Sequence, residues 1–180
     1  MIKIFWGFFF IVFHFNLTFG TSVISFLPDF VGYYLILSGI YELKDLASGF
    51  RKIKNWVLLL ALLKVVTFLL DLAGLSSLNQ PIAVITGIVL LVISLYVQYY
   101  IIYGIRQMEE SQQMDLYAAK LFSLWKIVAA CSILSYLCLI LSWLAAIFII
   151  ISALFDIVFL YYLWQSKKKF EQNMTSLPPF

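Results

Sequence analysis

Almost all the lysine and arginine residues of this chain lie in every second gap between its long apolar runs. Ten of the twelve fall in such gaps, whereas the intervening gaps, at residues 20–28, at 74–81 and around Ser142, contain none. Cytoplasmic loops of membrane proteins retain lysine and arginine because translocating these side chains is unfavourable. The pattern therefore predicts a multipass protein of a bacterial-type plasma membrane, with both termini and all basic gaps in the cytoplasm. The ten basic residues are Lys3, Lys44, Arg51, Lys52, Lys54, Arg106, Lys120, Lys167, Lys168 and Lys169.

The composition supports a membrane protein. The chain is 64% hydrophobic and 12% charged, a balance that would leave a soluble protein of this size with an apolar surface. The lipid bilayer is therefore the expected partner. The net charge of +3 is explained by cytoplasmic loops that meet anionic headgroups, and no basic stripe suggests a nucleic-acid partner. No connection is long enough for a separate soluble domain, so residues 1–180 are expected to form a single transmembrane domain.

Hydropathy and charge together predict an all-α bundle of six spans. A helix needs about 20 apolar residues to cross roughly 30 Å of hydrocarbon. The apolar run from Leu121 to Gln165 is long enough for two helices, and we expect a tight hairpin near Ser142. The six predicted spans cover residues 4–25, 27–46, 56–78, 82–105, 121–141 and 144–165.

The second span is the difficult one. Only Phe30 to Tyr41 lies free of charge between Asp29 and Glu42, a length that suggests a re-entrant or interfacial segment. If this segment failed to cross, however, the basic cluster from Lys44 to Lys54 would lie outside while the other basic gaps stayed inside. The charge distribution therefore favours a crossing helix.

The N-terminal segment is open to a second interpretation. Lys3, an apolar core and the small residues near Gly20 are typical of a cleaved signal peptide. His14 and Asn16 interrupt the region where a signal peptide is most apolar, which favours retention of residues 1–20. Cleavage would leave the orientation of the other spans unchanged.

Five ionisable residues within or beside the spans are candidate functional groups, because a charge at membrane depth costs at least about 2.5 kcal/mol. Three of them lie eight residues from a tryptophan that marks the cytoplasmic interface: His14 from Trp6, Lys64 from Trp56 and Asp156 from Trp164. These three residues are therefore expected at one depth in the membrane, with an ion pair between Lys64 and Asp156. The candidate polar interior consists of His14, Asp29, Lys64, Asp71 and Asp156, with Asp71 further outward and Asp29 at the outer mouth.

The sequence gives little support to catalysis. There is one histidine, so two-histidine zinc sites are excluded, and the HExxH, GxSxG and P-loop spacings are absent. Cys131 and Cys138 lie about 10 Å apart along one helix, too far for a disulfide. We expect no enzymatic activity, no catalytic residue, no metal site and no cofactor.

Residues 27–33 read Leu-Pro-Asp-Phe-Val-Gly-Tyr, and residues 37–43 read Leu-Ser-Gly-Ile-Tyr-Glu-Leu. Over residues 26–53 the chain resembles small uncharacterised multipass membrane proteins of bacteria that carry an L-P-D-F-[IV]-G-Y element. The resemblance implies no activity, but it suggests that the start of the second span is a signature element. Physically, Pro28 suits the first turn of a helix, Asp29 stabilises the helix dipole, and Gly32 permits close helix contact.

Two functions are compatible with these features. The first is a transport-like passage of protons or a small cation through the polar bundle interior. The alternative is a non-catalytic membrane scaffold or partner-binding subunit, in which the polar residues only hold helices together. Because six spans enclose little volume, transport would favour a homodimer; an unknown membrane partner would fit the scaffold.

Overall fold

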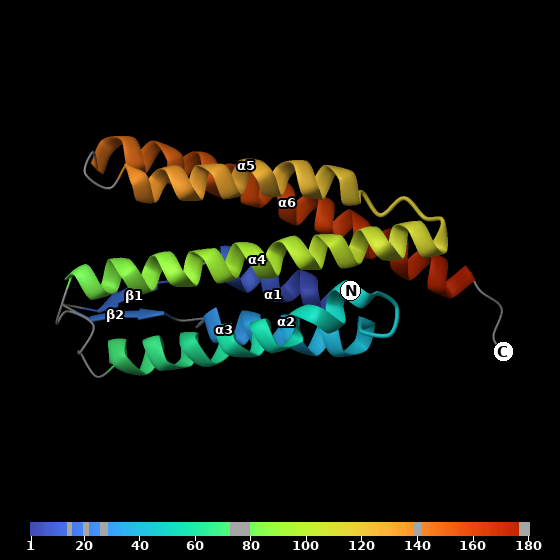
Figure 1. Cartoon of the computed structure of the whole chain (residues 1–180), viewed down its shortest axis with the longest axis horizontal. Helices are drawn as coiled ribbons and strands as arrows, with labels where there is room; N and C mark the ends of the chain where they lie inside the picture. Colours follow the sequence, from blue (N-terminus) through green and yellow to red (C-terminus); the bar gives the residue numbers. More distant parts are fainter. Residues whose placement is uncertain (14–15, 20–21, 26–28, 73–79, 139–141, 177–180) are drawn as a thin grey trace.

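A computed structural model describes residues 1–13, 16–19, 22–25, 29–72, 80–138 and 142–176 of the chain. These residues form six helices and one short β hairpin, and the architecture is an all-α bundle (Figure 1). The elements are α1 Ile2–Val12, β1 Asn16–Phe19, β2 Ser22–Ser25, α2 Asp29–Leu43, α3 Ser48–Leu72, α4 Gln80–Gln112, α5 Ala118–Leu137 and α6 Ser142–Ser176.

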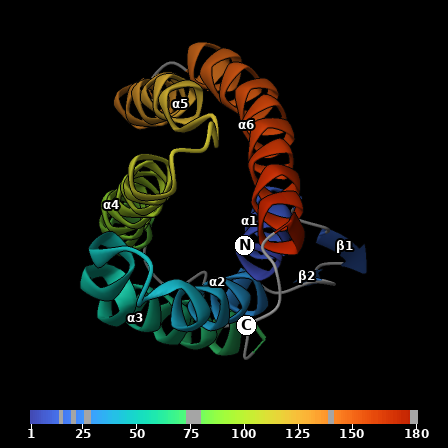
Figure 2. The same cartoon turned by 90° about the vertical axis from the view of Figure 1, so that its right-hand side faces the viewer.

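The six helices follow one another around a closed ring. Each packs against the next in the sequence, and α6 also packs against α1, so that the ring closes (Figure 2). The N-terminus and the C-terminal end of α6 lie toward the same end of the bundle (Figure 1). This is also the end at which α4 finishes and α3 begins, so the basic segments of the chain gather there. We call it the basic end.

Four helices, α3 to α6, are long and apolar enough to cross a membrane. They extend beyond the predicted spans at the basic end: α3 begins at Ser48 rather than near residue 56, and α6 continues to Ser176 rather than ending near residue 165. Several basic gaps are therefore helical continuations of the spans. The positive-inside pattern depends on charges close to the ends of spans, whether or not those charges lie in loops.

The prediction of one helix over residues 4–25 is wrong, and the helix within the predicted span 27–46 is shorter than that span. α1 has 11 residues and α2 has 15, so each helix alone covers only about 16 to 23 Å of a hydrocarbon layer of roughly 30 Å. Residues predicted to continue the first helix instead form an antiparallel hairpin, in which Asn16 pairs with Ser25 and Phe19 with Ser22. The β-branched residues Thr18, Val23 and Ile24 suit extended strands better than a helix.

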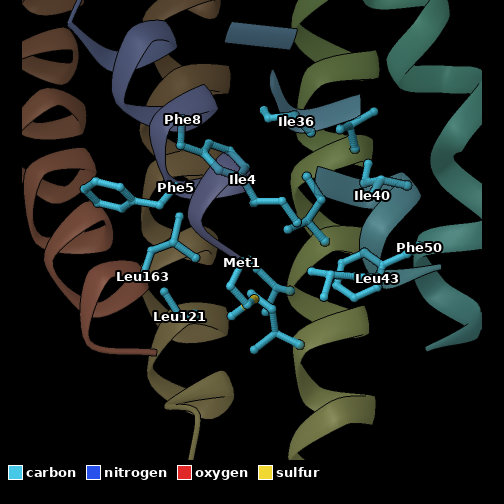
Figure 3. Close-up of a cluster of buried hydrophobic side chains, with 14 of the residues drawn as sticks. Met1, Ile4, Phe5, Phe8, Ile36, Ile40, Leu43, Phe50, Leu121 and Leu163 are labelled. Carbon is cyan, nitrogen blue, oxygen red and sulfur yellow. The ribbon is translucent and has the colours of Figure 1, made fainter. Parts of the chain in front are cut away.

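The packed core lies toward the basic end. It contains side chains from all six helices, and Figure 3 shows part of it between α1, α2 and α6, including Ile4, Phe8 and Ile40. The other half of the bundle is different. Among the described side chains, none is buried from Ala61 to Leu70 of α3, from Val84 to Tyr96 of α4, or from Ala146 to Val158 of α6. These helices therefore leave the core and present apolar surface, as lipid-facing segments do.

α1 is an integral part of this core. Ile4 and Phe8 are almost fully buried, and the Lys3 ammonium donates a 3.1 Å hydrogen bond to Ser38 of α2 and forms an ion pair with Glu42. A segment with these contacts contributes to the folded state. Retention of residues 1–20 therefore stays our prediction, although residues 14–15 and 20 lie outside the described residues.

Other polar contacts fix the loop between α4 and α5 at the basic end. Lys169 of α6 donates a 2.9 Å hydrogen bond to the Asp115 carboxylate. This bond lowers the pKa of Asp115 below its usual value, and a hydrogen bond from the Tyr117 backbone acts in the same direction. Both carboxylate contacts favour the ionised form, so the loop is tied to α6 at neutral pH.

Glycines bring α1 and α2 into close contact. A β-carbon on Gly7 would lie 2.6 Å from the carbonyl oxygen of Gly32, and one on Gly32 would lie 2.8 Å from the carbonyl oxygen of Gly7. Backbone atoms cannot move away without separating the helices. The expected close contact at Gly32 is therefore confirmed, and Gly7 is its counterpart.

Replacing Gly7 by alanine should destabilise the protein. Overpacking against a backbone carbonyl costs about 1–3 kcal/mol, so Gly7→Ala should lower the midpoint of thermal unfolding in detergent. Gly87→Ala is the matched control, because its β-carbon would meet the Tyr136 hydroxyl, the outer end of a side chain, at 2.8 Å. Equal midpoints for the two variants would contradict the close packing of α1 on α2.

Candidate functional site

An ion pair joins α2 to α3 near the middle of the bundle. The Lys64 Nζ atom lies 2.7 Å from Oδ2 of Asp29, and the two side chains are 26% and 16% exposed. Asp29 is the first residue of α2, where a carboxylate also interacts favourably with the helix dipole. The pair makes two mostly buried charges neutral together, which greatly reduces their cost within the membrane.

A second polar contact lies beside this pair. Tyr33, one helical turn after Asp29, is buried, and its hydroxyl lies 3.3 Å from Oγ of Ser94 on α4. Asp29, Tyr33, Lys64 and Ser94 thus link three consecutive helices of the ring. We call these four residues the polar junction.

The polar junction lies at the edge of the packed core. Lys64 follows Leu60, the last buried residue described in α3, by one turn. Ser94 precedes Val97, the first buried residue described in α4, by about one turn. The junction therefore separates two environments. On its basic side are fully buried apolar side chains, including Ile36 and Ile101, and on its other side the described residues of α3 and α4 are not buried.

The predicted ion pair between Lys64 and Asp156 is wrong, because Lys64 pairs with Asp29. A similar depth for the two residues fits the structure, since Asp156 also lies about one turn outside a buried residue of its helix, Phe159. Their positions around the ring differ, however. α3 packs against α2 and α4, whereas α6 packs against α5 and α1 (Figure 2). Equal depth on helices that are not neighbours does not produce a contact.

The other predicted site residues have different outcomes. Asp29 lies beside Lys64, and so deeper than the outer mouth where we expected it. Asp156 lies on α6, which packs against α5 and α1 rather than against α2 or α3. His14 lies outside the described residues, as does the side chain of Asp71, so their predicted roles stay predictions.

Sequence reasoning missed Tyr33 as a site residue. The signal that could have identified it is its position in the Leu-Pro-Asp-Phe-Val-Gly-Tyr element, one turn after Asp29 and therefore on the same helix face. Ser94 shares one face of α4 with Gly87 and Gln98, and stripes of small and polar residues let transmembrane helices approach and hydrogen-bond. The hydrogen bond between Tyr33 and Ser94 is a contact of this kind.

Metal binding has no support in the described part of the chain, where no group of three or more histidine, cysteine, aspartate or glutamate side chains is gathered. The two cysteines, Cys131 and Cys138, are both free thiols. What the polar junction offers instead is a carboxylate that could exchange one cation for another.

No known protein family, curated protein or solved structure matches this chain. The resemblance of residues 26–53 to small multipass proteins therefore stays an expectation. The contacts of the polar junction itself are the basis from which a function can be inferred.

Proposed function

We propose that this protein passes protons or a small cation across the membrane and that the polar junction is where the ion binds. The observation that carries the proposal is the position of the Asp29 and Lys64 pair at the edge of the core. A purely structural pair could be placed anywhere along α2 and α3. At this edge, an ion arriving from the non-basic end meets the Asp29 carboxylate before it reaches the buried apolar side chains of the core.

The chemistry of such a step is an exchange of cations on one carboxylate. A proton or a small cation that binds Asp29 displaces the Lys64 ammonium, which then gains freedom to leave the carboxylate. Leu60, Val97 and Ile36 are buried on the basic side of the junction, so the described conformation is closed toward that side. Passage then requires a second conformation in which these apolar side chains separate.

A membrane scaffold is the second candidate function. It is favoured by the fact that the groups of the junction satisfy one another, with Lys64 on Asp29 and Tyr33 on Ser94. Polar contacts of this kind also hold helices together in proteins that move nothing. Ion flux into proteoliposomes that contain the purified protein separates the two functions, because a scaffold gives none under any imposed gradient.

We also propose that both termini face the cytoplasm of a plasma membrane. Fusions of a compartment-sensitive reporter at Lys54, Arg106 and Lys169 should report a cytoplasmic position, and a fusion at Ser77 should report an external one. This result is expected whether α1 and α2 cross the membrane with the hairpin or return to the side from which they entered. An external signal at Lys54 would contradict the orientation.

A further inference from the structure

A cavity at the basic end is lined by charges and aromatic rings that the proposed transport does not use. It lies between the last turns of α4 and the first turns of α5 and has a volume of about 480 Å³. Tyr99, Tyr103 and Phe122 supply aromatic rings, and Arg106, Glu109 and Glu110 supply charges. Aromatic residues followed by charged ones mark the depth at which lipid headgroups meet a span. The cavity is therefore expected at headgroup level.

One of the two carboxylates is already engaged by the protein. An oxygen of Glu109 accepts hydrogen bonds from the backbone N–H groups of Leu116, at 2.9 Å, and Ala118, at 3.0 Å. Glu109 thus fixes the loop that leads into α5 and caps the start of that helix. An anionic ligand would find these N–H groups occupied.

The other two charged groups remain accessible. Arg106 donates a 3.0 Å hydrogen bond from Nε to Glu110 one turn later, and both side chains are about two-thirds exposed, at 65% and 64%. A guanidinium has five N–H donors, so four remain after this bond. Glu110 likewise has a second oxygen that can accept a hydrogen bond. The pair presents one positive and one negative group side by side at the cavity.

The charge balance of the lining selects the ligand. One guanidinium and two carboxylates give the lining a net negative charge, which disfavours lipids with a purely anionic headgroup. A headgroup that carries both a phosphate and an ammonium matches the pair, with the phosphate on Arg106 and the ammonium on Glu110. Tyr99, Tyr103 and Phe122 can hold the apolar part of the headgroup and attract its cation.

We propose that this cavity binds the headgroup of a zwitterionic phospholipid with a primary amine, of the phosphatidylethanolamine class. A primary ammonium has N–H groups to donate to Glu110, and a choline group has none. The cavity volume lies within the range of small-ligand sites. The acyl chains then follow the seam between α4 and α5 into the bilayer.

Native mass spectrometry of the full chain in detergent tests this site. The protein is mixed with equal amounts of phosphatidylethanolamine, phosphatidylcholine and phosphatidylglycerol, and soluble phosphoethanolamine is added in a separate arm. We expect phosphatidylethanolamine to be retained about tenfold better than the other two lipids, the effect of one charge-assisted hydrogen bond. Binding of soluble phosphoethanolamine without retention of phosphatidylethanolamine would assign the site to a free ligand and overturn the lipid proposal.

Two variants that differ in their effect on phosphatidylglycerol make the test specific. Arg106→Gln should reduce retention of phosphatidylethanolamine to the level of phosphatidylglycerol, because the phosphate loses its cation. Glu110→Gln should also lower it, but should raise retention of phosphatidylglycerol, because Arg106 is released from its carboxylate. Arg51→Gln is the matched control, since Arg51 is exposed, lies 3.8 Å from Asp45 and does not line the cavity.

Three results would overturn the proposal. The first is equal retention of phosphatidylethanolamine and phosphatidylglycerol by the unmodified protein. The second is retention of phosphatidylcholine at the level of phosphatidylethanolamine. The third is an Arg106→Gln variant that behaves like Arg51→Gln.

Discussion

Replacing Lys64 by methionine should lower the free energy of unfolding by about 3 kcal/mol, and Asp29→Asn should cost a similar amount. Each change leaves one mostly buried charge without its partner at membrane depth. Removing both charges should cost less than the sum of the single changes, because neither charge is then left alone. Reversible unfolding of the four proteins in mixed detergent micelles measures this coupling.

Two further cycles define the specificity of this pair. The Lys3 and Glu42 ion pair is the matched control: its side chains are 41% and 47% exposed, so its coupling should stay below about 1 kcal/mol. A cycle between Lys64→Met and Asp156→Asn should be additive, because Lys64 pairs with Asp29 on another helix. Strong coupling of Lys64 to Asp156 would contradict the arrangement of the helices around the ring.

The sequence predicted the helical class well because apolar runs and their charge boundaries follow directly from the solvent in which helices lie. The number of helices, six, was also predicted, and all six form among the described residues. The extent of the first helix was wrong, because residues 16–19 and 22–25 form strands. Hydropathy cannot distinguish the helix of Ile2–Val12 from the strand residues that follow it, because isoleucine, valine and phenylalanine suit both structures.

The charge pattern shows that the number of membrane crossings between two basic gaps is even, but it does not give that number. A second crossing is needed to bring Lys44 back to the cytoplasm only if the first span crosses. If neither α1 nor α2 crosses, Lys44 lies on the cytoplasmic side in any case. Four crossings and six therefore give the same distribution of lysine and arginine, and only helix lengths tell them apart.

The candidate site was predictable in its residues and not in its contacts. Lys64 and Asp29 were recognised because charged side chains at membrane depth need a reason to be there. Counting residues from tryptophan anchors gives depth along a helix, yet it contains no information on which helices are neighbours. The pairing of Lys64 follows from the short α2, which places Asp29 at the level of Lys64 and on the adjacent helix.

The glycines of α1 and α2 illustrate the same limit. Gly32 was expected at a close contact because small residues let transmembrane helices approach. Its partner Gly7 could be identified only after α1 and α2 were known to be antiparallel neighbours. Local chemistry predicts that a contact is needed, and the arrangement of helices decides where it is made.

Ion flux into proteoliposomes is the most direct test of the proposed function when the wild type is compared with two charge-neutral double variants. Asp29→Asn with Lys64→Met removes both charges of the polar junction, so that neither charge is left without its partner. Lys3→Gln with Glu42→Gln removes an ion pair between α1 and α2 that lies outside the junction. We expect proton or cation flux in the wild type and in the second variant, and none in the first. An inactive wild type under every imposed gradient, or an active Asp29 and Lys64 double variant, would contradict transport through the polar junction.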